Sequence, residues 1–67
     1  MTTFTFYICD DRHDIPITQI VIVRDAERAR LRAVEHLLES RHHTAIDVYE
    51  GANLRFSMTP GPAARAA

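Results

Sequence analysis

The chain has 67 residues, enough for one small domain but not for two. Hydrophobic residues make up 46% and charged residues 25%, a balance typical of a globular domain and not of a disordered chain. The net charge of −1 argues against a nucleic-acid partner, and no apolar run reaches the length of a membrane span.

The cysteine count bears on both stability and compartment. Cys9 is the only cysteine, so no internal disulfide can staple a domain that is small enough to be marginal on its own. A lone thiol fits a reducing compartment, and the first residues lack the basic stretch of a signal peptide. We therefore expect a cytoplasmic protein whose core is completed by a partner.

Two strands are predicted at the start of the chain. Residues 2–9 alternate, with Phe4, Phe6 and Ile8 on one face, which is typical of a strand. The polar residues 10–16 predict a loop, and residues 17–23 predict a second strand. The second half of that strand is apolar at every position, which suggests that both of its faces are covered.

A helix is predicted over residues 24–41. Asp25 and Glu27 suit a helix N-terminus, and the basic run at residues 41–43 suits a C-terminus. Arg30 falls within the apolar side and is expected to lay its stem along the sheet with its head in water. The predicted apolar stripe consists of Ala26, Ala29, Ala33, Val34 and Leu37, widened on one flank by Leu31 and Leu38.

A hairpin is predicted from residues 44–50 and 54–58. A two-residue turn would pair Val48 with Arg55 and mix the faces of the sheet, whereas a three-residue turn, 51–53, pairs Val48 with Phe56. The longer turn also pairs Glu50 with Leu54 and Ile46 with Met58. It places Asn53 where a left-handed conformation is needed, which asparagine tolerates.

These elements predict an α+β domain over residues 1–58, with a flexible tail at 59–67. A right-handed crossover favours an antiparallel sheet in the strand order 2-1-3-4, and the order 1-2-3-4 is the alternative. One helix covers one face of such a sheet. The other face would show an apolar patch, which suggests a homodimer or an unidentified protein partner.

The pattern resembles a group of short uncharacterised bacterial proteins that are common in alphaproteobacteria. The resemblance lies in FTFYICDD, in a helix with Asp25, Ala29 and Ala33 at four-residue spacing, and in a hairpin with Glu50-Gly51 at its turn. It covers nearly the whole chain. It departs from the pattern in the first hairpin, where the typical D-x-x-G turn is missing and Pro16 stands two residues after Asp14. It implies a ββαββ fold and no chemistry, because the group has no established activity.

A second, shorter segment resembles small toxin ribonucleases with a double-stranded-RNA-binding-like fold. Ser40-Arg41-His42-His43, followed by a hairpin, is similar to their Gly-Ser-His-His segment, in which a histidine is catalytic. The resemblance would assign that role to His42 or His43. The glycine, the second helix and the basic charge of that family are absent here.

Candidate site residues follow from these patterns. His42 and His43 are interpreted first as helix C-terminal caps with Glu39 as partner, and alternatively as an acid–base pair. The loop residues Asp10, Asp11, His13 and Asp14 are interpreted first as solvated, and alternatively as a weak divalent-metal site. Arg28 and Arg32 are interpreted as a solvated helix face paired with Asp25 and Glu35.

The sequence as a whole predicts a non-enzymatic interaction or regulatory module without a cofactor. Its interface on the uncovered face would include one alternating pair of the second strand, either Val21 with Val23 or Ile20 with Ile22. The residues assigned to the interface are Tyr7, Cys9, Val21, Val23 and Tyr49.

Overall fold

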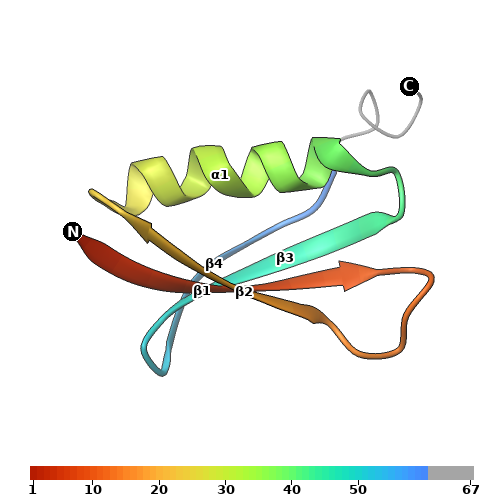
Figure 1. Ribbon diagram of the computed structural model, residues 1–67, viewed down its shortest axis with the longest axis horizontal. Coiled ribbons are helices and arrows are strands. Elements are labelled where there is room, and N and C mark those ends of the chain that lie inside the picture. Colours follow the sequence, from red (N-terminus) through yellow and green to blue (C-terminus); the bar gives the residue numbers. More distant parts are fainter. Residues whose placement is uncertain (61–67) are drawn as a thin grey trace.

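The computed structural model describes residues 1–60 as four strands and one helix in the order ββαββ (Figure 1). The elements are β1 (Thr2–Asp10), β2 (Ile17–Val23), α1 (Ala26–Glu39), β3 (His43–Glu50) and β4 (Asn53–Met58). The predicted tail overlaps residues 61–67, which lie outside the described residues. The predicted α+β class is confirmed.

The sheet has the order β2-β1-β3-β4 with all neighbours antiparallel, so the favoured topology is confirmed and the order 1-2-3-4 is wrong. β1 is central because α1 carries the chain from β2 across the sheet to pair β3 on the other side of β1. β2 is therefore an edge strand. The expectation that both of its faces are covered is also wrong, since Ile20 and Ile22 are 59% and 60% exposed.

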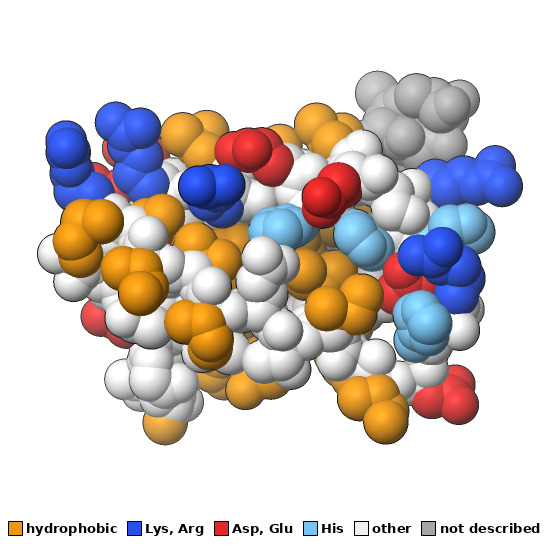
Figure 2. All heavy atoms as spheres, in the orientation of Figure 1, with side chains coloured by type: hydrophobic (Ala, Val, Ile, Leu, Met, Phe, Trp, Pro, Cys, Tyr) orange, Lys and Arg blue, Asp and Glu red, His pale blue; other side chains and the backbone are white. Residues whose placement is uncertain are grey.

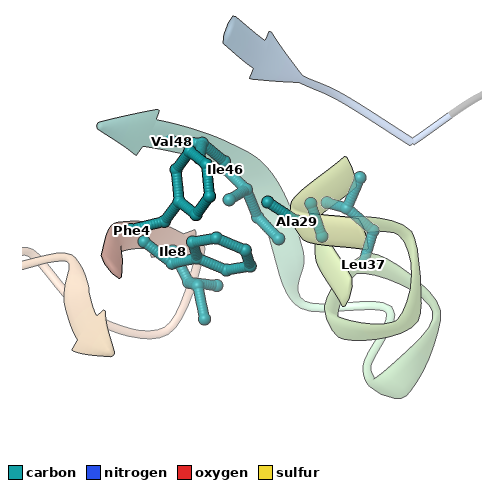
Figure 3. Packing of buried hydrophobic residues seen from close by; sticks show 8 residues of the cluster. Phe4, Ile8, Ala29, Leu37, Ile46 and Val48 are labelled. Carbon is teal, nitrogen blue, oxygen red and sulfur yellow. The ribbon is translucent and has the colours of Figure 1, made fainter. Parts of the chain in front are cut away.

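The core lies between α1 and one face of the sheet, as Figure 3 shows. Alternation in β1 sends Phe4, Phe6 and Ile8 toward the helix, where each is buried. The full buried cluster is Phe4, Phe6, Ile8, Ala29, Ala33, Leu37, Ile46 and Val48. All the fully buried apolar side chains of residues 1–60 thus belong to one layer.

Helix α1 is shorter than predicted at both ends. Asp25 is extended and caps the helix by accepting a hydrogen bond from the Arg28 backbone N–H at 3.0 Å. At the other end Ser40 is again extended, so residues 40 and 41 leave the helix. The alanines at 29 and 33 bring the helix close to the sheet.

The buried stripe of α1 is narrower than predicted. Ala29, Ala33 and Leu37 are buried, whereas Leu31, Val34 and Leu38 are exposed. Three residues suffice because the helix meets a single layer and has no second neighbour to bury its flank. The guanidinium of Arg30 lies 4.5 Å from the centre of the Phe56 ring in β4, so it stacks on an aromatic side chain as well as reaching the surface.

The turn between β3 and β4 differs from the predicted one. Val48 pairs with Phe56 and Ile46 with Met58, as predicted, but Glu50 pairs with Asn53 across the two residues Gly51 and Ala52. A shift in register between Val48 and Tyr49 absorbs the extra residue and restores the faces. Within the described chain the left-handed conformation falls on Gly51, with φ 61°, and not on Asn53.

Candidate functional site

The face of the sheet away from α1 carries an apolar band that no other described element covers. The band runs across all four strands, and its residues are Ile20 and Ile22 of β2, Tyr7 of β1, Tyr49 of β3 and Leu54 of β4. Apolar side chains appear along the lower side of Figure 2, across the sheet from the helix. We refer to these five residues as the open-face band.

Two tyrosines form the centre of the open-face band. The rings of Tyr7 and Tyr49 meet edge to face with their centres 5.3 Å apart. They come from neighbouring strands, one step apart diagonally, because Tyr49 is the Cα partner of Thr5. Asp47 accepts a hydrogen bond from the Ser57 hydroxyl at 2.8 Å and lies at the polar margin beside Tyr7. The band is interrupted on β1 by Thr5, which lies between Ile20 and Tyr49, and it has Asp47 and Ser57 as polar neighbours.

The predicted interface residues divide between the two faces. Tyr7, Cys9 and Tyr49 lie on the open face, as their alternation indicates, with Cys9 half-buried. Val21 and Val23 were assigned to the wrong face: they pack against the core beneath α1. The register explains this, because Val21 is the partner of the buried Phe4, which leaves Ile20 and Ile22 on the open side.

A second cluster of polar side chains lies where β1 ends beneath the C-terminus of α1. Asp10 continues the alternation of Phe4, Phe6 and Ile8 and is only 4% exposed. Its carboxylate accepts three hydrogen bonds from Arg12, from the backbone N–H at 2.8 Å, from Nε at 3.0 Å and from Nη2 at 2.7 Å. These bonds hold the pKa of Asp10 well below its usual range, and the carboxylate raises the pKa of Arg12.

His43 caps the helix, as the first interpretation states, but its partner is not Glu39. Its Nδ1 donates to the carbonyl oxygen of His36 at 2.6 Å, in the last turn of α1, where carbonyls have no helical partner. Its Nε2 lies 3.7 Å from the Asp10 carboxylate. The ring is 10% exposed, so it serves the packing of the helix end against β1 and β3.

His42 takes a different partner because neighbouring residues at the start of a strand point to opposite sides. Its Nδ1 donates to the Asp11 carboxylate at 2.8 Å, and the Asp11 backbone N–H donates to the His42 carbonyl at 2.9 Å. Glu39 pairs instead with His36, at 3.1 Å. Both His42 and His36 are therefore oriented by a carboxylate, and His42 is the more exposed of the two, at 32% against 17%.

The alternative metal site in the loop after β1 is not supported by the geometry. Asp10 is taken up by Arg12 and Asp11 by His42. Across residues 1–60, no three side chains of His, Cys, Asp or Glu converge in a way that could hold a metal ion. Of the acidic residues in this loop, Asp11 fastens it to the chain at residue 42, and Asp10 holds the loop's own Arg12.

The arginines of α1 also differ from the predicted arrangement. Neither Arg28 nor Arg32 forms an ion pair with Asp25, Glu35 or any other described residue. The Asp25 carboxylate is occupied by the backbone of the first helical turn. Arg28 and Arg32 line a groove together with Arg24, next to the end of β2.

Some of these features had a signal in the sequence and some had none. The alternation that identifies Phe4 to Ile8 also places Asp10 on the core side, and Arg12 is two residues away. The ion pair between Asp10 and Arg12 could therefore have been predicted from the sequence. The contacts of His42 with Asp11 and of His43 with His36 depend on how the helix end meets β1. They are tertiary and leave no local pattern.

No helix within residues 1–60 is long and apolar enough to cross a membrane. Comparison with known proteins found no matching family model, no matching curated protein and no matching solved structure.

Proposed function

We propose that this chain is a non-catalytic interaction module that acts as a homodimer through the open face of its sheet. The observation that carries the proposal is the open-face band: five large apolar or aromatic side chains on a face that no described element covers. Surface patches of this kind, surrounded by polar residues, are typical of protein interfaces.

The size of the core supports self-association. The buried apolar residues form one layer between α1 and the sheet. Three of its eight members, Ala29, Ala33 and Val48, are small and bury little apolar surface. A two-fold interface would place the same band of each copy against the other and add a second layer. Burial of Ile20, Ile22 and the tyrosine pair would then stabilise the folded chain by mass action.

The ribonuclease alternative draws on His42 alone. The His43 ring caps the helix through its bond to the His36 carbonyl. The His42 ring is oriented by Asp11 and remains partly exposed. An oriented imidazole is one part of an acid–base site, and the same contact also fastens the loop after β1. The open-face band involves more of the molecule, and we therefore favour the interaction module. Its single thiol leads us to place it in the cytoplasm.

The proposal is tested with two charge-matched double variants. Ile20→Glu with Ile22→Glu introduces two carboxylates into the band, and Leu31→Glu with Leu38→Glu introduces two on exposed positions of α1. Sedimentation equilibrium at micromolar concentration should give twice the chain mass of 7.6 kDa for the wild type and for the helix variant. The band variant should sediment as a folded monomer.

Two results would overturn the proposal. One is a wild-type chain that is a folded monomer at micromolar concentration. The other is a band variant that keeps the dimer, with circular dichroism showing that it is folded, because the dimer would then use another surface.

A further inference from the structure

The outer edge of β2 is unprotected. β2 and β4 are the two edge strands, and the edge of β4 is interrupted by the register shift and carries Arg55. Bulges and charges of this kind prevent an edge from pairing with another chain. Residues 17–23, ITQIVIV, contain no charge, no proline and no bulge, so β2 offers a row of backbone groups without a described partner.

A row of arginines stands beside this edge. Arg24, Arg28 and Arg32 are exposed and line one groove with Ile22 and Val23 at the end of β2. In Figure 2 basic side chains gather over the end where α1 begins, next to apolar ones. None of the three arginines has an ion pair within residues 1–60, in a chain whose net charge is −1. Glu35 also lines the groove and Asp25 caps the first turn of the same helix, but neither carboxylate lies within ion-pair distance of the three guanidinium groups.

The two features match one kind of ligand. Side chains on one face of a strand repeat every two residues, about 6.6–6.8 Å, and helix residues four apart rise about 6 Å. A strand added to β2 would therefore present alternate side chains at nearly the spacing of Arg28 and Arg32. Carboxylates at those positions would meet guanidinium groups that have no other partner.

We propose that the edge of β2 is a docking site for an extended acidic segment of a partner protein, which adds to the sheet as a fifth strand. Backbone hydrogen bonds to β2 would supply the affinity. Glutamates or aspartates at alternate positions, facing Arg24, Arg28 and Arg32, would make the site specific for negatively charged segments. The site uses neither the Tyr7–Tyr49 pair nor the histidines, and it shares Ile22 of β2 with the open-face band.

The test uses a fluorescein-labelled eight-residue peptide of alternating Glu and Val, and the full chain. Fluorescence anisotropy should show saturable binding that weakens as salt is raised. Hydrogen exchange should show new protection of backbone amides in residues 17–23 of the bound chain. A peptide with Lys in place of Glu should not bind, and a peptide N-methylated at alternate residues should lose most of its affinity, because it cannot pair with the edge.

Protein variants separate the two halves of the site. Arg28→Gln with Arg32→Gln should weaken peptide binding about tenfold. Arg41→Glu makes the same change in net charge at the far end of α1 and should leave binding within about twofold of the wild type, because that residue lies outside the groove.

Three results would overturn the proposal. The first is equal binding of the Lys peptide or of the N-methylated peptide. The second is binding without protection in residues 17–23. The third is tighter binding of a single-stranded oligonucleotide of eight nucleotides than of the Glu peptide, which would assign the arginines to phosphate recognition.

Discussion

Asp10 shows how one residue can belong to the core by its position and to the surface by its chemistry. Its backbone continues the alternation that buries Phe4, Phe6 and Ile8, so its side chain faces the helix end. A carboxylate in that position would be costly without partners. Arg12 supplies them from two residues away. Its guanidinium binds both carboxylate oxygens, with Nε on Oδ1 and Nη2 on Oδ2, and its backbone N–H also donates to Oδ1. The strand can therefore end on a buried acid.

This contact predicts an acid-dependent stability. The folded-state pKa of Asp10 is depressed, so its contribution is complete above the unfolded-state value near 3.9 and is lost as the pH falls below it toward the folded value. Urea unfolding of Asp10→Asn should show lower stability than the wild type at pH 7. The difference should stay constant down to about pH 5 and shrink below pH 4.

The exposed loop residue Asp14 provides the control for this experiment. Asp14→Asn removes the same charge and should follow the wild-type curve at neutral pH. A gap between Asp10→Asn and the wild type that does not change between pH 7 and pH 3 would contradict the assignment of the acid dependence to Asp10.

The elements were predictable to the extent that each depends on its own residues. Alternation in residues 2–9 and the acids at 25 and 27 identified a strand and a helix start because those signals are local. The strand order followed from crossover handedness, which is a general rule. The faces of β2 were not predictable, because Ile20 to Val23 are all apolar. Only pairing with Phe4 decides that Val21 turns inward and Ile20 outward.

The predicted length of the β3–β4 turn was wrong for a related reason. The pairing of Val48 with Phe56 and of Ile46 with Met58 was predicted from matching faces. Two loops satisfy that condition: three residues without a bulge, or two residues with one. The choice depends on backbone energy, and the structure takes the loop that gives the positive φ to Gly51, where no Cβ is strained.

The turn makes a prediction about Gly51. A Cβ at this position would have no atom within 4 Å, so an added side chain meets no steric obstacle and any cost comes from the φ of 61°. Gly51→Ala should lower the free energy of unfolding by about 1–2 kcal/mol in urea titrations. Gly51→Asn should cost less, because asparagine enters the left-handed region more readily. Equal stability of all three chains would show that the turn has another conformation.

At the scale of the whole molecule, the helix attaches to the sheet through very few side chains. Ala29 and Ala33 allow a close approach but bury little area, so Leu37 is the one large side chain of α1 in the core. It belongs to the same buried cluster as the core residues of β1 and β3, two strands that come from different hairpins. Figure 3 labels it on α1 with Phe4, Ile8, Ile46 and Val48 of that cluster. Loss of this side chain would weaken the hold of α1 on both hairpins at once.

Leu37 and its neighbour Leu38 therefore provide a matched pair. Leu37 is 7% exposed and Leu38 is 64% exposed, although the two residues have the same chemistry and the same helix propensity. Leu37→Ala should cost about 2–5 kcal/mol, through lost burial and the cavity left behind. Leu38→Ala should stay within about 0.5 kcal/mol of the wild type, since it removes exposed surface.

The stability lost in Leu37→Ala should approach the whole free energy of unfolding of this domain. A domain of 67 residues has a total stability of about 3–10 kcal/mol at typical values per residue. Leu37→Ala should consequently unfold both hairpins in one transition at low urea, with circular dichroism and tyrosine fluorescence changing together. A helix signal that melts while the Tyr7–Tyr49 signal persists would show instead that the sheet is stable without α1. In that case the open face, and not the helix, would hold the molecule together.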